Sequence, residues 1–441
     1  MSDVLFTNVR IFDGTGAPSF RGEVLVRDNR IAAVAKGRSW AEGHQAELVD
    51  GGGATLMPGL VDAHTHLSFA STIDRIVDFG AMLPPEQLML ATVRAGKTML
   101  DHGFTSAYSA GCFNAAAEVE LREEFARGAL PGPRLRACSF EREGAALGSG
   151  GADYHQGYQR RKPDPQGNAA FVHAMAKLGV DSVKFVLSGE SGIQPGTSRI
   201  VQFYEEELVA ASQAAREAGV WLNAHCHAGE AIKMAARNGF RVLYHCTWAD
   251  EEAMDLLEAR KHEIFIAPAP GINWANIHEG EAFGITREVA QAQEQFLALE
   301  LVSELMPKLK KRGIRILPGG DYGFPWNPIG KNARDLELFV KLFGFTPMEA
   351  LCAATKLGGE IMGMEGDLGL IKKGYLADLL LVAGDPTRDV SLLQDRANLL
   401  AIMKNGQFHK RPATARPEPV VRAPRRGSIG DRVLGGRAMR P

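Results

Sequence analysis

An apolar segment that ends in two histidines sets the strongest limit on how this chain can fold. Residues 56–66 read LMPGLVDAHTH, so His64 and His66 are one residue apart. Side chains alternate between the two faces of a β-strand, and both imidazoles therefore point the same way. The Pro58-Gly59 pair is a turn signal before the strand. Two parallel imidazoles can bind one metal ion, so we expect further ligands near the ends of other strands.

Strand-like runs alternate with helical stretches through residues 57–361. The predicted strands are 103–108, 182–186, 220–225, 241–245, 264–267 and 314–317. The predicted helices are 85–103, 169–178, 204–218, 230–238, 251–259 and 291–312. Repeated strand–helix units imply a parallel sheet covered by helices. With about eight units, the prediction is an α/β fold containing a TIM-like (β/α)8 barrel.

Short β runs flank the predicted barrel on both sides. They lie at 4–12, 23–26 and 31–34 before it, and at 366–369, 374–382 and 399–404 after it. We expect residues 1–56 and 362–410 to form one small β-sandwich domain. Residues 411–441 are rich in Pro, Arg and Gly without periodicity, which predicts a flexible basic tail.

Composition excludes several classes of protein. The net charge is only −2, so no overall field attracts nucleic acid or an anionic membrane. No run of 18 apolar residues predicts a membrane span, and the N-terminus lacks a signal-peptide pattern. The five cysteines are odd in number and scattered, which favours reduced thiols and a cytoplasmic location. Cys226 and Cys246 adjoin histidines, where a buried filler is favoured over a thiolate ligand.

Five further residues stand where later ligands are expected. Lys184 lies inside the apolar strand SVKFVL, where a charged amine is costly unless it is paired or modified. Either a carboxylate partner or carboxylation of the amine would solve this. His225 and His227 form a second pair at one-residue spacing, His245 ends the next strand, and Asp321 follows a late one. The carboxyl ends of barrel strands converge, and imidazole with carboxylate suits Zn²⁺ or a similar ion.

This ordered set resembles the metal-dependent amidohydrolase superfamily, and within it the imidazolonepropionase-like and Xaa-Pro dipeptidase-like branch. The resemblance rests on the opening MPGLVDAHTH, on the later ligand candidates, and on the closing segments GDLG (366–369) and KGYLADLL (373–380). It covers roughly residues 1–410. The activity it implies is hydrolysis of a C–N bond in an amide, a peptide-like bond or a cyclic amide.

The resemblance also implies a role for each ligand candidate. His64 and His66 would hold one divalent ion, and carboxylated Lys184 would bridge it to a second ion held by His225 and His245. Zn²⁺ is favoured, with Mn²⁺ or another divalent ion as an alternative. Asp321 would contact the first ion and act as the general base on a metal-bound hydroxide, the nucleophile.

A mononuclear alternative remains open. Residues 227–230 read HAGE, a motif that resembles adenosine-deaminase-like members. In that case His227 would bind the metal and Glu230 would protonate a heterocycle. Lys184 favours the two-metal hydrolase, because the mononuclear deaminases do not need it. A non-catalytic barrel scaffold receives little weight, because the ligand set is complete.

Substrate clues come from aromatic residues near the predicted strand ends. The loop after Asp321 contains Tyr322 and Trp326, and Trp248 follows His245 closely. Aromatic walls favour an apolar or ring-containing small molecule. We expect these three residues to bind substrate, and list with them His227, Tyr108 and His155. The resemblance also implies a homo-oligomer.

Overall fold

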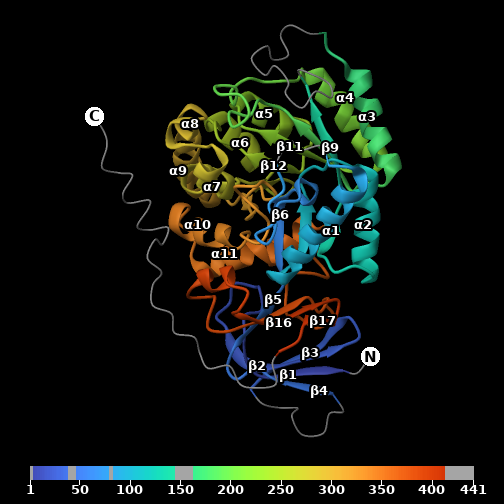
Figure 1. The fold of residues 1–441 in the computed structure, drawn as a ribbon, viewed down its shortest axis with the longest axis vertical. Coiled ribbons are helices and arrows are strands. Elements are labelled where there is room, and N and C mark those ends of the chain that lie inside the picture. The colour runs from blue at the N-terminus through green and yellow to red at the C-terminus, as the bar shows by residue number, and fades with distance from the viewer. Residues whose placement is uncertain (1–2, 38–45, 79–82, 145–161, 413–441) are drawn as a thin grey trace, which may run out of the picture.

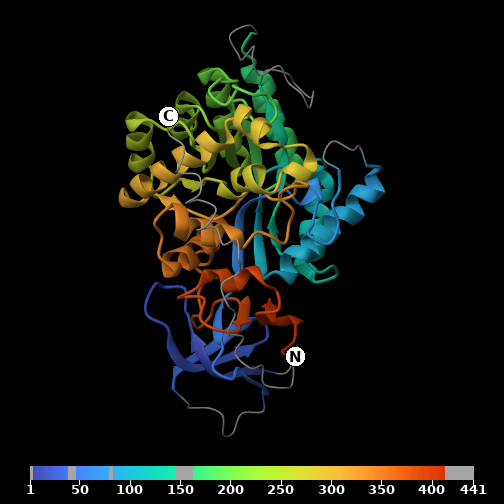
Figure 2. The same ribbon diagram turned by 60° about the vertical axis from the view of Figure 1, so that its left-hand side comes forward.

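The computed structural model describes residues 3–37, 46–78, 83–144 and 162–412. A layer of β-strands lies at one end of the elongated molecule, and a larger α/β part lies above it (Figure 1). Both ends of the described chain contribute to the β layer, in blue and red, while the middle of the chain forms the α/β part (Figure 2). The predicted 411–441 tail falls almost wholly outside the described residues.

The α/β part contains two parallel sheets. One has the order β6-β7-β8 and the other the order β14-β13-β12-β11-β10-β9. The strands are β6 (Leu60–Thr65), β7 (Phe104–Ser109), β8 (Arg134–Arg136), β9 (Cys138–Glu143), β10 (Ser182–Val186), β11 (Trp221–Cys226), β12 (Val242–His245), β13 (Phe265–Ala267) and β14 (Arg315–Ile316). Only Ala137 separates β8 from β9. At the other edge, the Asp321 amide donates to the His64 carbonyl at 3.1 Å, which links the segment after β14 to β6.

Helices follow most of these strands. They are α1 (Pro85–Asp101), α2 (Ala115–Arg127), α3 (Pro165–Leu178), α4 (Glu205–Ala218), α5 (Gly229–Arg237), α6 (Glu251–Ala259), α7 (Pro270–His278), α8 (Arg287–Ala292), α9 (Gln295–Lys311), α10 (Arg334–Leu342), α11 (Pro347–Ala354) and α12 (Lys356–Ile361). Buried strands flanked by outer helices leave the parallel sheets without a solvent face, which explains their continuous apolar runs.

Residues from both ends of the chain form one eight-stranded mixed sheet. Its order is β17-β16-β15-β5-β1-β2-β3, and β4 also pairs with β1. The strands are β1 (Val4–Ile11), β2 (Phe20–Arg27), β3 (Arg30–Lys36), β4 (Glu47–Asp50), β5 (Thr55–Pro58), β15 (Leu379–Val382), β16 (Leu399–Lys404) and β17 (Gln407–Lys410). The join is antiparallel between β5 and β15, with Leu56 opposite Leu381. The predicted pairing of the two terminal segments is therefore confirmed.

Most predicted elements are confirmed to within a few residues, while one predicted β run is wrong and another is shorter than predicted. The helix predicted at 291–312 is α9, which starts four residues later because Glu294, between it and α8, has a left-handed φ of 59°. Residues 366–369 form turns and not a strand, and Gly369 closes against the carbonyl of Thr355 with a φ of 90°. Of the predicted strand at 374–382, only β15 is regular. No helix in the described ranges is long and apolar enough to cross a membrane.

Candidate metal centre

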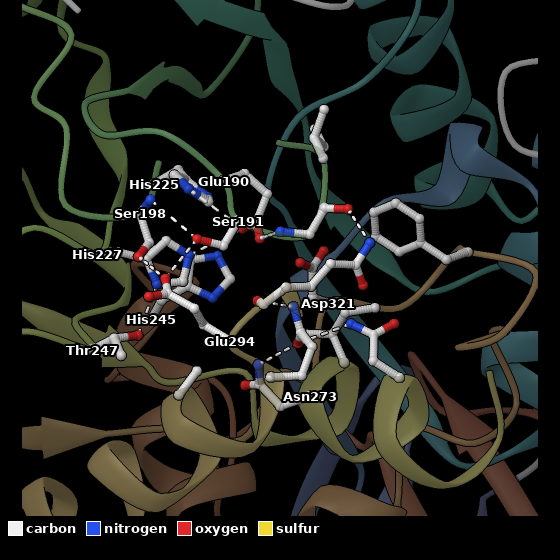
Figure 3. A pocket seen from close by; sticks show the side chains of 18 of the residues that line it. Glu190, Ser191, Ser198, His225, His227, His245, Thr247, Asn273, Glu294 and Asp321 are labelled. Atoms are coloured by element: carbon white, nitrogen blue, oxygen red, sulfur yellow. Dashed lines mark hydrogen bonds and ion pairs between the residues drawn. The ribbon is translucent and has the colours of Figure 1, made fainter. Parts of the chain in front are cut away.

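A cavity of about 530 Å³ lies at the carboxyl ends of the parallel strands. All six ligands expected from the sequence line it, together with His227. Figure 3 labels His225, His227, His245 and Asp321 among the residues of the cavity wall. The six are His64, His66, Lys184, His225, His245 and Asp321. They come from β6, β10, β11, β12 and the segment after β14, so parallel strands bring together residues that are distant in sequence.

The first side-chain group in the cavity joins β6 to the segment after β14. An Asp321 carboxylate oxygen lies 3.1 Å from His66 Nε2 and 3.5 Å from His64 Nε2. His66 Nδ1 lies 2.9 Å from the carbonyl of Gly111. A ring that donates from Nδ1 to a carbonyl keeps its Nε2 lone pair for a ligand, the arrangement typical of metal-binding histidines.

The second group joins β11, β12 and the loop after β10. Single ligand atoms of Glu190, His225, His227 and His245 all lie within 4.8 Å of one another. Burial lowers the pKa of His225 to about 3 and that of His245 well below its usual value. These rings are therefore neutral, which is the protonation state that binds a cation.

Backbone strain accompanies two of the predicted ligands. His245 has a φ of 68° and Asp321 a φ of 61°, both in the left-handed region that few residues other than glycine adopt. Such conformations cost on the order of 1–3 kcal/mol each and cluster at functional sites. Here they turn each side chain at the end of its strand toward the cavity.

Lys184 lies at the centre of β10 with its side chain almost fully buried. Its Nζ donates to the carbonyl of Ala110 at 2.8 Å and to Glu141 at 3.3 Å, and lies 4.3 Å from the ring centroid of Tyr244. Glu141 is also its register partner on β9. A carboxylate partner for the Lys184 amine therefore lies within reach, and carboxylation of this lysine stays a prediction.

Two buried aspartates hold the first group in place, and neither was foreseen from the sequence. Asp62 accepts the amide N–H of His64 at 2.8 Å and the side-chain amide of Asn332 at 2.7 Å. Asp335, in the first turn of α10, accepts the amide of Gly319 at 3.1 Å. Burial raises the pKa of Asp62 to about 6 and that of Asp335 to about 7.

The structure does not bring two of the predicted substrate residues to the cavity. Tyr322 is fully buried, and its hydroxyl donates to Asp335 at 2.8 Å. Tyr108 is also fully buried, and its hydroxyl donates to Asn223 at 2.9 Å. Each side chain points into the packed interior, where its hydroxyl has the hydrogen-bond partner that a buried phenol needs. His155 lies outside the described residues.

Aromatic rings do form part of the cavity wall, as predicted from Trp248 and Trp326. Trp326 stacks on Phe324 with ring centroids 5.3 Å apart. Phe69, which follows β6, stacks on His66 at 4.1 Å and was not foreseen. The rest of the wall comes from β9, from the segment 190–198 and from the region of α7, α8 and α9, of which the sequence pattern indicated only α9. Glu190 also lines the cavity, four residues beyond the strand predicted at 182–186, and only its place after Lys184 could have suggested it.

The acid required by the mononuclear alternative is elsewhere. Glu230 lies in the first turn of α5 with about half its side chain exposed, and pairs with Arg237 at 2.7 Å. It is not among the described residues that line the cavity.

Cys226 and Cys246 are fully buried, and their mutual hydrogen bond together with burial raises the pKa of the Cys246 thiol. Both therefore act as small packing residues.

The donor set fits a divalent metal. Nε2 of His245 and Oδ1 of Asp321 are buried without a hydrogen-bond partner. An unpaired buried polar atom costs about 1–3 kcal/mol, and a bound cation removes that cost. Neutral imidazoles with carboxylates are the ligands that Zn²⁺ and similar ions prefer.

Residues 55–408 match the model of the amidohydrolase family, and the chain belongs to that family. It is a hydrolase that acts on carbon–nitrogen bonds. Among characterised relatives, it is 25% identical to ochratoxinase of Aspergillus niger over 433 residues, covering 91% of this chain and 85% of the relative. It is 24% identical to imidazolonepropionase of Rubrobacter xylanophilus, covering 87% and 89% of the two chains.

Solved structures give the same picture of the fold. A Xaa-Pro dipeptidase with bound methionine superposes with a TM-score of 0.75 at 24% identity, over 93% of this chain and all of the other. The structure of A. niger ochratoxinase superposes with a TM-score of 0.76 at 20% identity, over 94% and 97% of the two chains. The amidohydrolase membership predicted from the ligand motifs is confirmed by the family model, and the imidazolonepropionase relative supports the predicted branch.

Proposed function

We propose that this protein is a two-metal hydrolase of amides or cyclic amides. The observation that carries the proposal is the convergence of five histidines, Lys184 and Asp321 on one cavity at the strand ends. His64, His66 and Asp321 would hold one ion, and His225 and His245 a second. Lys184, when carboxylated, would bridge the two. When bound, such ions supply Lewis acidity and lower the pKa of water.

The chain itself moves protons and excludes solvent. Asp321 is the general base, because its carboxylate lies within 3.5 Å of both histidines of the first group. The same carboxyl group can then return the proton to the departing nitrogen. Asp62 and Asp335 each fix one part of this group, Asp62 through the amide of His64 and Asp335 through the amide of Gly319. The apolar wall keeps bulk water from the reacting carbonyl.

The substrate we propose carries an apolar or aromatic group next to the scissile bond. Phe69, Phe324 and Trp326 form a continuous aromatic wall beside the first group of ligands. His227 and Trp248 face the same cavity from β11 and the segment after β12. Relatives named ochratoxinase and imidazolonepropionase support an amide or cyclic amide as the reacting bond.

The finer description of the fold is also a proposal. We infer that the two parallel sheets are arcs of one closed (β/α)8 barrel, supported by the short link at Ala137 and by the hydrogen bonds from 318–321 to β6. The terminal sheet would be a β-sandwich domain made of residues 1–56 and 362–410. A cytoplasmic location, Zn²⁺ as the metal and a homo-oligomeric state remain predictions from the sequence.

Metal analysis and a substrate screen test the function together. The purified protein should contain divalent metal and lose activity on chelation, and Zn²⁺ or Mn²⁺ should restore it. The screen would compare N-acyl amino acids, dipeptides, aryl amides and cyclic ureides. A protein that binds no divalent ion, and that no added ion activates on any of these amides, would refute the proposal.

A further inference from the structure

Glu190 and His227 extend the pair of histidines expected to hold the second ion. Glu190 Oε2 lies 3.0 Å from His227 Nε2 and 3.7 Å from His225 Nε2. Zn²⁺ bonds of 2.0–2.1 Å in a tetrahedron place neighbouring ligand atoms roughly 3.4 Å apart. The observed separations lie on either side of that value. With His245, the cluster offers four ligand atoms within 4.8 Å of one another.

Hydrogen bonding orients the His227 ring toward this cluster. Its Nδ1 lies 2.7 Å from the hydroxyl of Thr247, which leaves Nε2 facing Glu190. A polar partner on the outer nitrogen fixes the orientation of a ligating histidine. Between Nε2 and the carboxylate there is room for either a proton or a cation.

An independent observation favours the cation. Nε2 of His245 is buried and has no hydrogen-bond partner. The ring stacks on that of His227 with centroids 4.4 Å apart and lies 4.6 Å from that of His225. A proton between Glu190 and His227 leaves this nitrogen unsatisfied. A cation at the centre of the cluster would satisfy all four residues together.

The cluster also supplies the negative charge that a metal site needs. Glu190 provides one carboxylate from the protein itself, about a quarter exposed toward the cavity. Lys184 in its amine form is already engaged with Ala110 and Glu141. A site built from Glu190 therefore does not require a chemical change at that lysine.

We propose that Glu190, His225, His227 and His245 form a four-ligand site for a divalent cation that fills without carboxylation of Lys184. The inference rests on the proposed function only in taking His225 and His245 as ligands of the second ion. It adds Glu190, a ligand that the resemblance does not assign. It also places His227, a ligand only in the mononuclear alternative, beside His225 and His245 in the second site, and it separates occupancy of this site from the state of the lysine.

The test measures Co²⁺ and Zn²⁺ binding to chelator-stripped protein, by calorimetry and by elemental analysis after gel filtration. Four proteins are compared in carbon-dioxide-free buffer: wild type, Lys184→Met, Glu190→Gln and, as control, Glu294→Gln. Glu294 also lines the cavity but bonds to Ser191, Ser198 and Arg199. The visible spectrum of bound Co²⁺ reports its ligand number independently of activity.

Lys184→Met should retain one tightly bound ion with a four-coordinate cobalt spectrum. Glu190→Gln should weaken that ion at least about 100-fold, since even outer partners of ligands change metal affinity 10- to 100-fold. Glu294→Gln should bind as wild type does. The proposal is overturned if Lys184→Met, or wild type without carbon dioxide, binds no ion, or if Glu190→Gln binds as tightly as wild type. Bound metal without hydrolysis of any amide would instead overturn the proposed function alone.

Discussion

Replacing Gly319 with alanine should disable the centre without replacing any ligand. A Cβ at Gly319 would lie 2.5 Å from the backbone nitrogen of His64 and 2.8 Å from its Cβ. Ordinary contact begins at 3.4 Å, so β6 and the Asp321 segment must separate by about 0.9 Å. A misplacement of about 1 Å can cost roughly 100-fold in rate. We therefore expect kcat/KM to fall about 100-fold, which corresponds to a loss of about 2.7 kcal/mol of transition-state stabilisation.

The assay measures kcat/KM on the best amide from the screen, with metal content and circular dichroism on the same samples. Overpacking should also cost about 1–3 kcal/mol of unfolding free energy. The matched control is Gly366→Ala, because a Cβ there meets nothing within 4 Å and φ is not left-handed. If Gly319→Ala keeps its metal and a kcat/KM within twofold of wild type, the close approach of these two segments does not set the ligand geometry.

Three other perturbations have defined outcomes. Glu230→Gln should leave kcat/KM within about twofold, because the side chain is exposed and paired with Arg237; a loss of about 100-fold would restore the mononuclear mechanism. Trp326→Ala should raise KM for aryl amides about tenfold and change kcat little, whereas an equal loss for small aliphatic amides would remove Trp326 from substrate binding. Burial raises the pKa of Asp335 from 3.8 to about 7, so its contribution to stability falls as pH rises between these values. Urea unfolding of chelated samples should therefore show wild type losing more stability than Asp335→Asn between pH 4.5 and about 7.5.

The ligands were predictable because each lies within or soon after a regular strand, whose period fixes the side that a residue faces. The two-residue period of a strand was enough to place His64 and His66 on the same face, and Lys184 stood out as a charged residue inside an apolar run. Tyr108 and Tyr322 were predicted to face the cavity only because they lie near strand ends. That position does not show whether a phenol finds a hydrogen-bond acceptor in the interior. The acceptor of Tyr322 is Asp335, which lies 13 residues further along the chain in another element.

The wall of the cavity was not predictable from periodicity. The break at Glu294 depends on one backbone angle, and this residue then bonds to Ser191 and Ser198 about a hundred positions earlier. Glu190 carried no pattern of its own. Its proximity to His225, His227 and His245 follows from the pairing of β10, β11 and β12 in one sheet.

The join between β5 and β15 has a consequence for the order in which the protein can be made. Leu56 pairs with Leu381, 325 positions later, and β5 leads through Gly59 directly into the strand that carries His64. During synthesis, that edge of β5 has no partner until residues 379–382 have left the ribosome. Contacts between residues this far apart in sequence slow folding, because the chain loses entropy in closing the long loop before the contact stabilises the structure. The β5 segment that leads into the metal-binding strand is therefore made early but completes its pairing late.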